Sequence, residues 1–592
     1  MDKRRSIVIL DFGGQYAHLI ASRVRRLGVY SEIREAETSA DDLKDAAGII
    51  LSGGPSSVYD KDATQGDPYI LKMGVPVLGI CYGHQWIAHV LHGKVEPGIT
   101  KEYGRSEVEV VDKGSFLGSV SSPRYVAWMS HGDEVKELPK GFKQVLRSDT
   151  CEIAGMEDTE KRIYGIQFHP EVRHTGEDGR NILTRFVEAC DADPWSVKSY
   201  ASQIEEEIKE TVGDRKVFML VSGGVDSTVA FTLLDKVLGP ERVQGLLVDT
   251  GLMRKDEVSQ IQEALKDLGL PNLRVEDASE EFFTNLKDVY GPEEKRKIIG
   301  DTFLAVQKRV SEEMGLTVEN GWMLGQGTIY PDTIETGGTK HADQIKTHHN
   351  RVESVQKMID QGLVIEPLKD LYKDEVRELG EELGLPHDLV WRHPFPGPGL
   401  GVRILCGREP ESGIRNQESG KLLPVKSVGV QGDGRTYRHA IAFFSEQPCE
   451  VSQELWKQST DIPNKDPQIN RVLKCTSHSK PVEFVFTPGY IIRDRADLLR
   501  EADAIVSEEM HRARLYEKIW QFPVVLLPFG KSKGGQSIVL RPIESTDAMT
   551  ANGVHLPEDV LKKMTEQILS LDGIDLVFLD LTSKPPATIE WE

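Results

Sequence analysis

The chain has 592 residues, of which 39% are hydrophobic and 28% charged, and its formal net charge is -22. Single hydrophobic cores stop growing at roughly 250–300 residues, so we expect roughly three or four domains. The composition is that of a soluble globular protein and argues against a disordered chain. The negative charge argues against a nucleic-acid binder, which needs a basic surface, but leaves phosphate-bearing small molecules open.

The sequence predicts neither a membrane span nor a secretion signal. Its first apolar run, Ile7 to Leu10, is too short for a signal peptide, and no apolar stretch approaches the roughly 18 residues of a membrane span. The cysteines form no C-x-x-C pair, which argues against the common zinc spacings and against a disulfide framework. We therefore expect a cytosolic protein. The cysteines are Cys81, Cys151, Cys190, Cys406, Cys449 and Cys475.

The first 195 residues alternate short apolar runs with helical periodicity. The runs at 6–10, 47–51, 75–80 and 162–168 predict strands, and the periodicity at 17–27 predicts a helix that Gly28 ends. This alternation predicts an α/β fold with a doubly wound parallel sheet, in which sites lie at the carboxyl ends of the strands. We therefore expect the functional residues of a first domain, 1–195, in the loops that follow these runs.

Residues 196–402 predict a second α/β domain with a doubly wound parallel sheet. A polar helix at 197–213 leads into it, and the runs KVFML at 216–220 and VQGLLVD at 243–249 predict strands. The proline and glycine cluster HPFPGPGLG at 393–401 predicts a linker at its end.

Residues 403–592 contain a weak internal repeat. LLPVKSVGVQGDGRTYRHAIAFF, from Leu422, resembles LLPFGKSKGGQSIVLRPIES, from Leu526. Further on, QINRVLK in the first copy matches GIDLVFL in the second at nearly the same spacing. Each copy predicts strands and a helix, so we expect a duplicated α+β domain with subdomains at 403–480 and 481–592.

The stretch LGICYGHQ places Cys81 between a predicted buried strand and a predicted helix. Gly79 and Gly83 permit the sharp turn that lifts a nucleophile out of a sheet, as in the serine elbow of α/β-hydrolases. The helix N-terminus behind Cys81 favours a thiolate, and the N–H of Tyr82 is a candidate oxyanion donor.

A general base is available in the segment IQFHPEV. In an extended segment residues two apart face the same side, so Glu171 can orient His169 while His169 serves the cysteine. The turn LSGGPSSV adds the backbone of Gly53 and Gly54 as further oxyanion donors. A lone buried cysteine or histidine is more often structural; their combination with an elbow and a glycine turn favours catalysis.

The stretches GICYGHQ, LSGGPSSV, WMSHGDEV and FHPEV resemble the class I glutamine amidotransferase family over the whole first domain. The resemblance implies that Cys81 attacks the side-chain amide of glutamine, forms a thioester and releases ammonia, with His169 as base and Glu171 as its partner. It also implies a glutamine site made by Gln85 and by the backbone at Ser130 and His131. His84 is expected to be only a neighbour in the helix.

The loop VSGGVDST at 221–228 follows a predicted strand and precedes a predicted helix, as phosphate loops do, but it has no lysine. Backbone N–H groups, hydroxyls and the helix N-terminus remain to hold phosphates, which suits diphosphate as a leaving group. Asp226 is a candidate ligand of Mg²⁺ on ATP. The predicted ATP site comprises Ser222, Gly223, Gly224, Val225, Asp226, Ser227, Thr228 and, after the next strand, Asp249.

The same loop resembles that of the N-type ATP pyrophosphatases, which adenylylate a carbonyl oxygen and then admit a nitrogen nucleophile. Further runs, among them GQGTIYPDTIE, EPLKDLYKDEVR and DLTSKPPATIEWE, resemble the GMP synthetase family over nearly the whole chain. This resemblance implies that ATP adenylylates XMP and that ammonia from glutamine then displaces AMP to give GMP. Mg²⁺ would accompany ATP.

The GMP synthetase resemblance also implies two sets of binding residues. Lys584 and Arg296 suit a phosphate monoester, and the full XMP set is Arg296, Asp433, Arg435, Gln521, Lys584, Thr588 and Glu590. A lid near ATP would contain Lys346, His348, His349, Lys369 and Asp370. Adjacent histidines could instead bind a metal, but strand neighbours face opposite sides and no third ligand lies at metal spacing, so we do not expect one.

Two alternatives to GMP synthesis remain open. One is a related glutamine-dependent ligase with another acceptor, such as an NAD synthetase, and the other is a non-catalytic nucleotide-binding scaffold. The motif RTY occurs only in the first C-terminal copy and KPPATIEWE only in the second. Because family members with a single copy dimerise through it, we expect an intrachain pseudo-dimer and a largely monomeric protein. Nucleic-acid and membrane partners are not expected.

Overall fold

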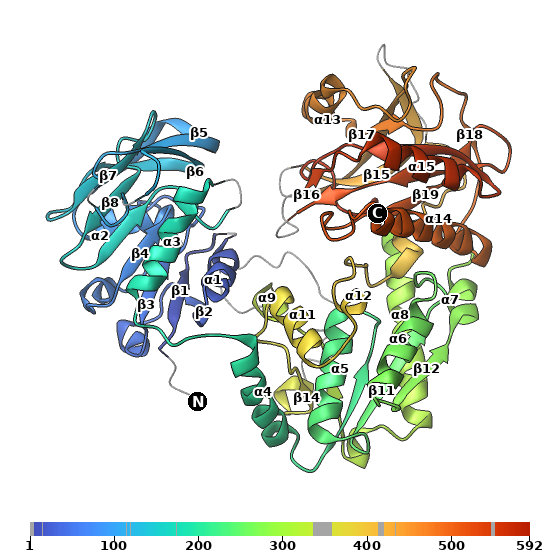
Figure 1. Cartoon of the computed structure of the whole chain (residues 1–592), viewed down its shortest axis with the longest axis horizontal. Helices are drawn as coiled ribbons and strands as arrows, with labels where there is room; N and C mark the ends of the chain where they lie inside the picture. The colour runs from blue at the N-terminus through green and yellow to red at the C-terminus, as the bar shows by residue number, and fades with distance from the viewer. Residues whose placement is uncertain are drawn as a thin grey trace. The chain divides into compact units, whose positions relative to one another are not determined.

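The computed structural model describes residues 5–14, 16–113, 115–118, 120–172, 175–335, 358–411, 420–431, 434–545 and 551–592. The chain forms two compact units (Figure 1). The first comprises Met1–Glu206, Ile329–Arg351 and Lys369–Glu375, and the second comprises Glu207–Thr328, Val352–Leu368 and Val376–Glu592. Within the described residues, no helix has the length and apolar character needed to cross a bilayer.

The first unit is built on a nine-stranded sheet with the order β2-β1-β3-β4-β9-β8-β7-β5-β6. Its strands are β1 (Ile7–Asp11), β2 (Ser31–Glu35), β3 (Gly48–Leu51), β4 (Val77–Ile80), β5 (Lys94–Val110), β6 (Arg124–Glu137), β7 (Lys143–Ser148), β8 (Gly155–Asp158) and β9 (Ile163–Ile166). Its helices include α1 (Ala17–Arg26), α2 (Tyr82–Val90) and α3 (Glu177–Ala189), with short 3₁₀ turns at Ala40–Leu43 and Pro68–Lys72.

Five of these strands, from β2 to β9 in sheet order, are parallel; the sequence predicts four of them, and β2 was not predicted. The other four pair antiparallel, so the sheet is mixed and not wholly parallel. Alternate residues of β1 enter separate clusters, Ile7 and Ile9 on one face and Val8 and Leu10 on the other, so this part of the sheet is buried on both sides. Gly28, at φ +81°, follows the end of α1 as expected.

The second unit begins with a five-stranded parallel sheet in the order β12-β11-β10-β13-β14, which confirms the parallel prediction for this domain. Its strands are β10 (Lys216–Leu220), β11 (Val243–Asp249), β12 (Leu273–Asp277), β13 (Trp322–Gly325) and β14 (Val364–Ile365). The helices of this part of the chain are α4 (Val197–Val212), α5 (Val225–Leu238), α6 (Glu257–Asp267), α7 (Ser279–Asn285), α8 (Pro292–Glu313), α9 (Tyr330–Glu335), α11 (Lys373–Glu382) and α12 (His387–Val390), with a 3₁₀ turn at Val318–Asn320.

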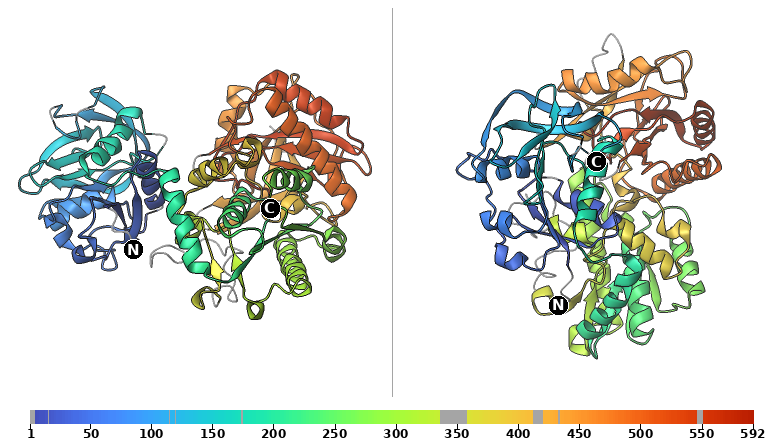
Figure 2. Two further views of the ribbon diagram at one scale, coloured as in Figure 1. Left: turned by 60° about the horizontal axis from the view of Figure 1, so that its bottom comes forward. Right: turned by 60° about the vertical axis from the view of Figure 1, so that its left-hand side comes forward.

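Helices lie on both faces of this parallel sheet (Figure 2). Phe218 of β10 and Leu246 of β11 belong to a cluster with Ile299 of α8. On the other face Gly245 of β11 lies against Phe231 of α5, where a Cβ on the glycine would come within 2.7 Å of the ring. The centre of the sheet is therefore buried on both sides, which is why β10 and β11 are mostly apolar, whereas the edge strand β12 (LRVED) is only partly buried.

The carboxyl end of the HPFPGPGLG segment is packed in the core, whereas Gly397 is exposed and the prolines are partly buried. Gly399–Val402 make a 3₁₀ turn in which every residue is buried, and Leu400 N donates to Leu252 O at 2.8 Å. Gly399 has φ +61°, and a Cβ there would lie 2.3 Å from Leu252 O, so only glycine fits.

The C-terminal part of the second unit contains a six-stranded sheet in the order β15-β16-β17-β24-β21-β19. The strands are β15 (Lys421–Gln431), β16 (Gly434–Phe443), β17 (Ile469–Cys475), β19 (Val524–Leu527), β21 (Gln536–Leu540) and β24 (Ile574–Asp580). Two-stranded sheets pair β18 (Val485–Phe486) with β20 (Phe529–Gly530) and β22 (Ile543–Glu544) with β23 (Asn552–Gly553). The helices are α13 (Gln453–Lys465), α14 (Arg493–Arg512) and α15 (Glu558–Leu569).

The order of parallel and antiparallel pairings in this sheet is the same from either edge to the centre. β15–β16 and β19–β21 are antiparallel, β16–β17 and β21–β24 are parallel, and β17 pairs antiparallel with β24 at the centre. When only the strands of this sheet are counted, each half runs strand, strand, helix, strand, with α13 before β17 and α15 before β24; the second half also contains β20, β22 and β23.

Candidate active sites

Cys81 lies at the turn between β4 and α2, as the sequence predicts. Its backbone has φ 54° and ψ -105°, a positive φ that is unusual for a residue with a side chain. The glycines around it are required by close packing, because a Cβ on Gly79 would lie 2.5 Å from Gly83 O and one on Gly83 would lie 2.4 Å from Leu51 O. The turn therefore holds the thiol at the end of β4 and at the N-terminus of α2.

His169 and Glu171 form a buried pair beside this thiol. The His169 Nδ1 atom lies 2.7 Å from Glu171 Oε1, and the two side chains are 4% and 0% exposed. Burial alone would lower the pKa of His169, but the Glu171 carboxylate and the interaction with Cys81 outweigh it and raise the pKa to about 10. The predicted base and its partner are thus together, and the site favours an imidazolium next to the sulfur.

Gly53 lies against the side chains of both His169 and Cys81. A Cβ on this residue would come 3.2 Å from His169 Cε1 and 3.7 Å from Cys81 Cβ. Gly54 follows it in a packed turn, where a Cβ would lie 2.7 Å from Phe12 O. Tyr82 opens α2, so its N–H is one of the first four that lack an intrahelical acceptor. Of the predicted oxyanion donors, Gly53 and Tyr82 therefore lie next to Cys81, and Gly54 packs against Phe12 and Tyr82.

The strand that carries Ser130 and His131 also reaches the site. Cys81 Sγ lies 3.5 Å from Ser130 O, and His131 Nδ1 lies 3.0 Å from Asp133 O. These residues belong to β6, which sequence analysis did not assign to the sheet.

Gln167 is a site residue that the sequence analysis missed. Its Nε2 donates to Cys81 Sγ at 3.6 Å, and its Oε1 accepts from Gln85 Nε2 at 3.2 Å. Gln85 also donates to Asp133 O at 2.7 Å and is 3% exposed. The signal for Gln167 was its place two residues before His169 in an extended segment, which puts the two on the same side.

The lysine-free loop follows β10 and leads into α5, as predicted. Ser222 Oγ and Ser227 Oγ are 3.2 Å apart, and Gly223 takes φ +81°. Gly224 is the N-cap of α5, and its carbonyl accepts from the hydroxyls of Ser227 and Thr228 at 3.0 and 2.9 Å. Val225 and Asp226 follow in the first turn of the helix.

Two further strand ends meet this loop at the same sheet edge. Asp249 ends β11, the neighbour of β10, and its Oδ1 accepts from Gly251 N at 2.8 Å. After β13, Gly327 lies so near the loop that a Cβ would come 2.9 Å from Ser227 N. Among the described residues, no group of three or more His, Cys, Asp or Glu side chains is placed to hold a metal ion.

Four predicted XMP residues contact the segment 588–592 or belong to it. The Glu590 carboxylate is held by Arg403 Nε and Nη2 at 3.1 and 2.9 Å and accepts from Gln521 Nε2 at 3.3 Å. Arg296 Nη2 donates to the backbone carbonyl of Glu592. Thr588 Oγ1 donates to Val428 O at 3.0 Å, so its hydroxyl is occupied within the fold.

Lys584 pairs through its backbone with Ala551, with its N–H 2.7 Å from Ala551 O. Arg435 lies on β16, where its backbone pairs with Val430, and Asp433 lies outside the described residues.

The predicted lid falls partly outside the described residues, since Lys346, His348 and His349 lie in 336–357. Lys369 and Asp370 belong to the first unit. Asp370 O accepts from Arg25 Nη1 at 2.5 Å, and Asp370 Oδ2 accepts from Tyr200 at 3.1 Å. Arg25 is 4% exposed and also pairs with Glu375.

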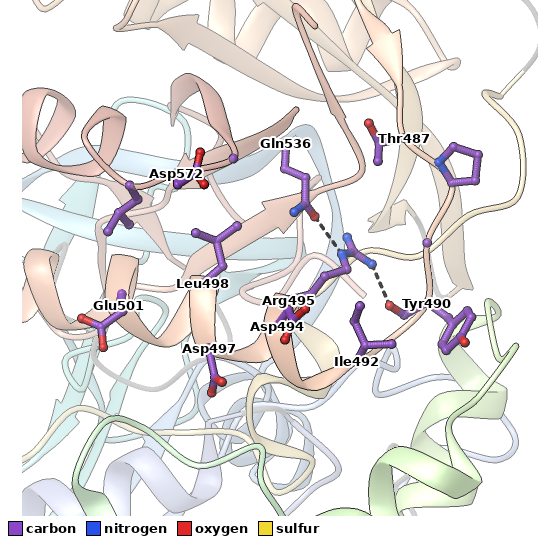
Figure 3. A pocket seen from close by; sticks show the side chains of 14 residues that line it. Thr487, Tyr490, Ile492, Asp494, Arg495, Asp497, Leu498, Glu501, Gln536 and Asp572 are labelled. Carbon is purple, nitrogen blue, oxygen red and sulfur yellow. Dashed lines mark hydrogen bonds between the residues drawn. The ribbon is translucent and has the colours of Figure 1, made fainter. Parts of the chain in front are cut away.

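A pocket of about 630 Å³ lies elsewhere, between the start of α14 and the turn before β24 (Figure 3). None of the predicted site residues lines it. Arg495 stands in its wall with its donors satisfied, giving hydrogen bonds to Gln536 Oε1 at 2.7 Å and Tyr490 O at 3.1 Å.

A thiol beside a buried histidine–glutamate pair, in a chain that also has a phosphate loop without lysine, is typical of the glutamine amidotransferases fused to an ATP pyrophosphatase-type domain. Family models agree: "Glutamine amidotransferase class-I" matches residues 8–189, "NAD synthase" matches 196–297 and "GMP synthase C terminal domain" matches 508–591.

Similar proteins cover the full chain. A protein of Leptospira interrogans named "Probable GMP synthase" (glutamine-hydrolyzing) is 47% identical over 99% of this chain and 99% of its own length. GMP synthases (glutamine-hydrolyzing) of Lactobacillus johnsonii and Dictyostelium discoideum are 39% and 37% identical over 99% of this chain, and over 98% and 94% of their own lengths. The chain belongs to the glutamine-hydrolysing GMP synthase family.

Proposed function

We propose that this protein makes GMP from XMP, ATP and glutamine, releasing AMP, diphosphate and glutamate. The observation that carries the proposal is the grouping of Cys81, His169 and Glu171 in a chain that also has a lysine-free phosphate loop after strand β10. Family membership over the full chain supports it. The two alternatives from the sequence, another acceptor or an inactive scaffold, lose support, because the catalytic side chains are assembled and the full-length relatives are GMP synthases.

The glutaminase half-reaction follows from the geometry of the first site. The Cys81 thiolate attacks the amide carbon of glutamine, and the oxyanion is received by N–H groups at Gly53 and Tyr82. The His169 imidazolium gives its proton to the departing nitrogen, so ammonia leaves and a glutamyl thioester remains. His169, now neutral, takes a proton from water as the water cleaves the thioester, which yields glutamate and restores the thiolate. Glu171 stabilises the imidazolium form throughout.

The second half-reaction uses the loop at 222–228. The 2-oxygen of XMP attacks the α-phosphorus of ATP, the bond to the β-phosphate breaks, and diphosphate departs into the cradle of N–H and hydroxyl groups. Ammonia then attacks the activated carbon of adenylyl-XMP and AMP leaves. Asp249, at the end of the neighbouring strand, shares this sheet edge.

Mg²⁺ fits this site as a partner of the phosphates. The loop offers hard oxygen donors, the paired hydroxyls of Ser222 and Ser227 and the carboxylate of Asp226, and few other protein ligands. Mg²⁺ is usually held by one or two carboxylates with substrate phosphates and water. When bound, it would neutralise phosphate charge, while the residues of the loop position the chain of phosphates.

We assign XMP to the surface of the segment 584–592. The carboxylate of Glu590 is fixed by Arg403, which leaves it oriented to accept from ribose or base. Lys584 and Arg296 supply positive charge for the monoester, with Gln521 and Thr588 beside them. Asp433 and Arg435 complete the proposed set, and Lys346, His348, His349, Lys369 and Asp370 remain the proposed lid over ATP.

We also propose that residues 403–592 arose by duplication and form an intrachain pseudo-dimer, which makes the protein a monomer. The support is the symmetric sheet, in which each half runs strand, strand, helix, strand and the halves join through β17 and β24. The domain limits at 195 and 402 remain a proposal from the sequence. Six cysteines that all stay free support a reducing cytosol.

One assay tests the proposed function. The purified protein is incubated with XMP and labelled ATP, with either glutamine or ammonium chloride as nitrogen source. We expect GMP with both sources and diphosphate as the phosphorus product. Release of orthophosphate, or no GMP from ammonia, would overturn the proposal, whereas GMP from ammonia alone would contradict only the glutaminase assignment.

A further inference from the structure

Arg392 lies just after α12, and a buried ion pair fixes its side chain. Its Nη1 is 2.9 Å from Glu257 Oε1, and the two side chains are 11% and 5% exposed. The partners are far apart in sequence, so the pair exists only in the folded second unit. It joins the segment before Gly399 to the first residue of α6.

The Glu257 carboxylate places this pair against the phosphate loop. A Cβ on Gly223 would lie 3.6 Å from Glu257 Oε1, the oxygen that Arg392 contacts. The other oxygen, Oε2, accepts from Arg254 N at 3.0 Å. Both carboxylate oxygens are therefore occupied, and the guanidinium is anchored beside the second residue of the loop.

The second terminal nitrogen of Arg392 has no acceptor in the part of the chain that the structure describes, although it is shielded from solvent. A buried donor of a charged group without an acceptor is destabilising, and such groups in native proteins are usually satisfied by a ligand, ion or water. Arg254 and Arg403, close by in the fold, use their Nη2 atoms on His393 O and on Glu590. Arg392 is thus held by one nitrogen while the other stays available.

The charges around Arg392 indicate which ligand suits it. Burial lowers its pKa, and Arg254 lowers it further, while Glu257, Tyr516 and Asp226 raise it. The guanidinium remains charged at physiological pH. Glu257, which Arg392 contacts, lies against Gly223 of the loop, whose N–H groups and helix N-terminus favour anions. An additional anion there would relieve the cost of the buried cation.

We propose that Arg392 Nη2 donates to the phosphates of ATP held by the loop at 222–228 and so supplies the fixed positive charge that a lysine gives in other phosphate loops. The inference rests on the proposed function and names a residue of the same site. When the bond between the α- and β-phosphates breaks, negative charge grows on the departing diphosphate. A charge-assisted hydrogen bond from Arg392 stabilises that leaving group.

The test uses the full-length Arg392→Gln and Arg392→Lys variants. Two quantities are measured: binding of inorganic diphosphate by calorimetry, and the KM for ATP in the ammonia-dependent reaction at saturating XMP. For Arg392→Gln we expect diphosphate binding to weaken, and the KM for ATP to rise, by roughly tenfold to hundredfold. The KM for XMP should stay unchanged. Arg392→Lys keeps a cation for Glu257, so it should fold even if the glutamine variant does not, and should show a smaller loss.

Arg495→Lys is the matched control, since Arg495 is also buried but gives its donors to protein acceptors (Figure 3). It should lose thermal stability and keep wild-type diphosphate binding. Unchanged diphosphate binding in both folded Arg392 variants would overturn the proposal, and so would a change in the KM for XMP alone. The inference and the proposed function can also fail separately. If the wild-type protein binds diphosphate, Arg392→Gln weakens that binding, and the protein makes no GMP, the inference is upheld while the proposed function is rejected.

Discussion

Arg471 Nη1 lies 2.8 Å from Asp580 Oδ2, and neither side chain has any exposed surface. The two residues sit on β17 and β24, the strands that join the halves of the C-terminal sheet. The same carboxylate oxygen accepts from Arg541 Nη1 at 2.9 Å and from Trp591 Nε1 at 3.0 Å. Arg471 Nη2 also donates to Thr588 Oγ1 at 3.0 Å and to Glu590 O at 2.9 Å. Arg471, in the first half of the sheet, therefore anchors the proposed XMP-binding segment 584–592 by hydrogen bonds to Thr588 and Glu590.

Asp580→Asn should destabilise the protein, because it leaves two buried guanidinium groups without a counter-charge. Removing one partner of a buried ion pair destabilises by about 3–5 kcal/mol. We expect a lower melting temperature in calorimetry and a raised KM for XMP. Glu312→Gln, which removes an exposed pair with Lys308, serves as the control and should change stability by less than about 0.5 kcal/mol. Wild-type stability in Asp580→Asn would contradict the assignment.

Cys81→Ala should abolish glutamine-dependent GMP formation and leave the ammonia-dependent reaction intact, because the thiol serves only the first half-reaction. Asp226→Ala should lose activity with both nitrogen sources. Cys151→Ala is the matched control for the cysteine, since Cys151 is fully buried in the same unit and should retain glutamine use. Full glutamine-dependent activity in Cys81→Ala would show that the nucleophile lies elsewhere.

Glu171→Gln should lower glutamine turnover by roughly 10²–10⁴-fold while sparing ammonia use, because the imidazolium loses its counter-charge. The pKa of His169 is raised from 6.5 to about 10, so its stabilising contribution is complete below pH 6.5 and is lost as pH rises towards 10. The melting temperature of the variant should thus fall less than that of the wild type between pH 7 and 9. Equal falls would argue against the pair. Glu177→Gln, at an exposed position, is the control.

His84 should make the protein sensitive to acid. Burial lowers its pKa from 6.5 to about 3. Its Nε2 lies 3.2 Å from Ile153 O, and its buried Nδ1 lacks a hydrogen-bond partner among the described residues. An unfolded chain takes up this proton below pH 6.5 and the folded chain does not, so stability falls from pH 6.5 towards pH 3 by at most about 1.4 kcal/mol per pH unit.

The check is the pH dependence of the melting temperature in His84→Gln, which should be flatter than in the wild type between pH 6.5 and 4. His89→Gln, on the same helix but partly exposed, should keep the wild-type slope. Identical slopes in His84→Gln and wild type would place the acid sensitivity elsewhere.

The protein should sediment as a single species near its chain mass of 66.1 kDa. In the proposed pseudo-dimer the central strands β17 and β24 already pair with each other, so no strand is left there for a second chain. Analytical ultracentrifugation at micromolar concentration distinguishes the states. A stable dimer would contradict the proposal that the intrachain pseudo-dimer keeps the protein monomeric.

That Cys81, His169 and Glu171 lie together could be predicted from sequence, because they lie in local patterns. Cys81 sits on a strand–turn–helix signal, and His169 and Glu171 are two apart on one extended segment. The antiparallel strands were missed, although β6 shows the alternating burial of a half-exposed strand along Tyr125 to Ser130. The sequence does not show this period of two, because Val126 and Trp128 on the less buried side are apolar too.

Arg392 and Arg471 could not be predicted from sequence, because nothing local distinguishes them. Arg392 meets Glu257 across 135 residues, and Arg471 meets Asp580 across 109. From sequence alone, an arginine in a loop or strand is expected to be a solvated side chain, because its partners are known only from the fold. The packing of Gly399 to Gly401 could not be predicted for a related reason, since the prolines and glycines of the segment indicate a turn but do not reveal what packs against it.

The pairing of β17 with β24 also bears on how the chain is made. On the ribosome β17 emerges long before β24 (residues 574–580). The edge of β17 that pairs with β24 therefore stays unpaired while about a hundred further residues are added. An open, apolar strand edge is a template for association with other chains. Nascent molecules are therefore most vulnerable to aggregation during that interval, and slow translation of this stretch would lower the yield of native enzyme.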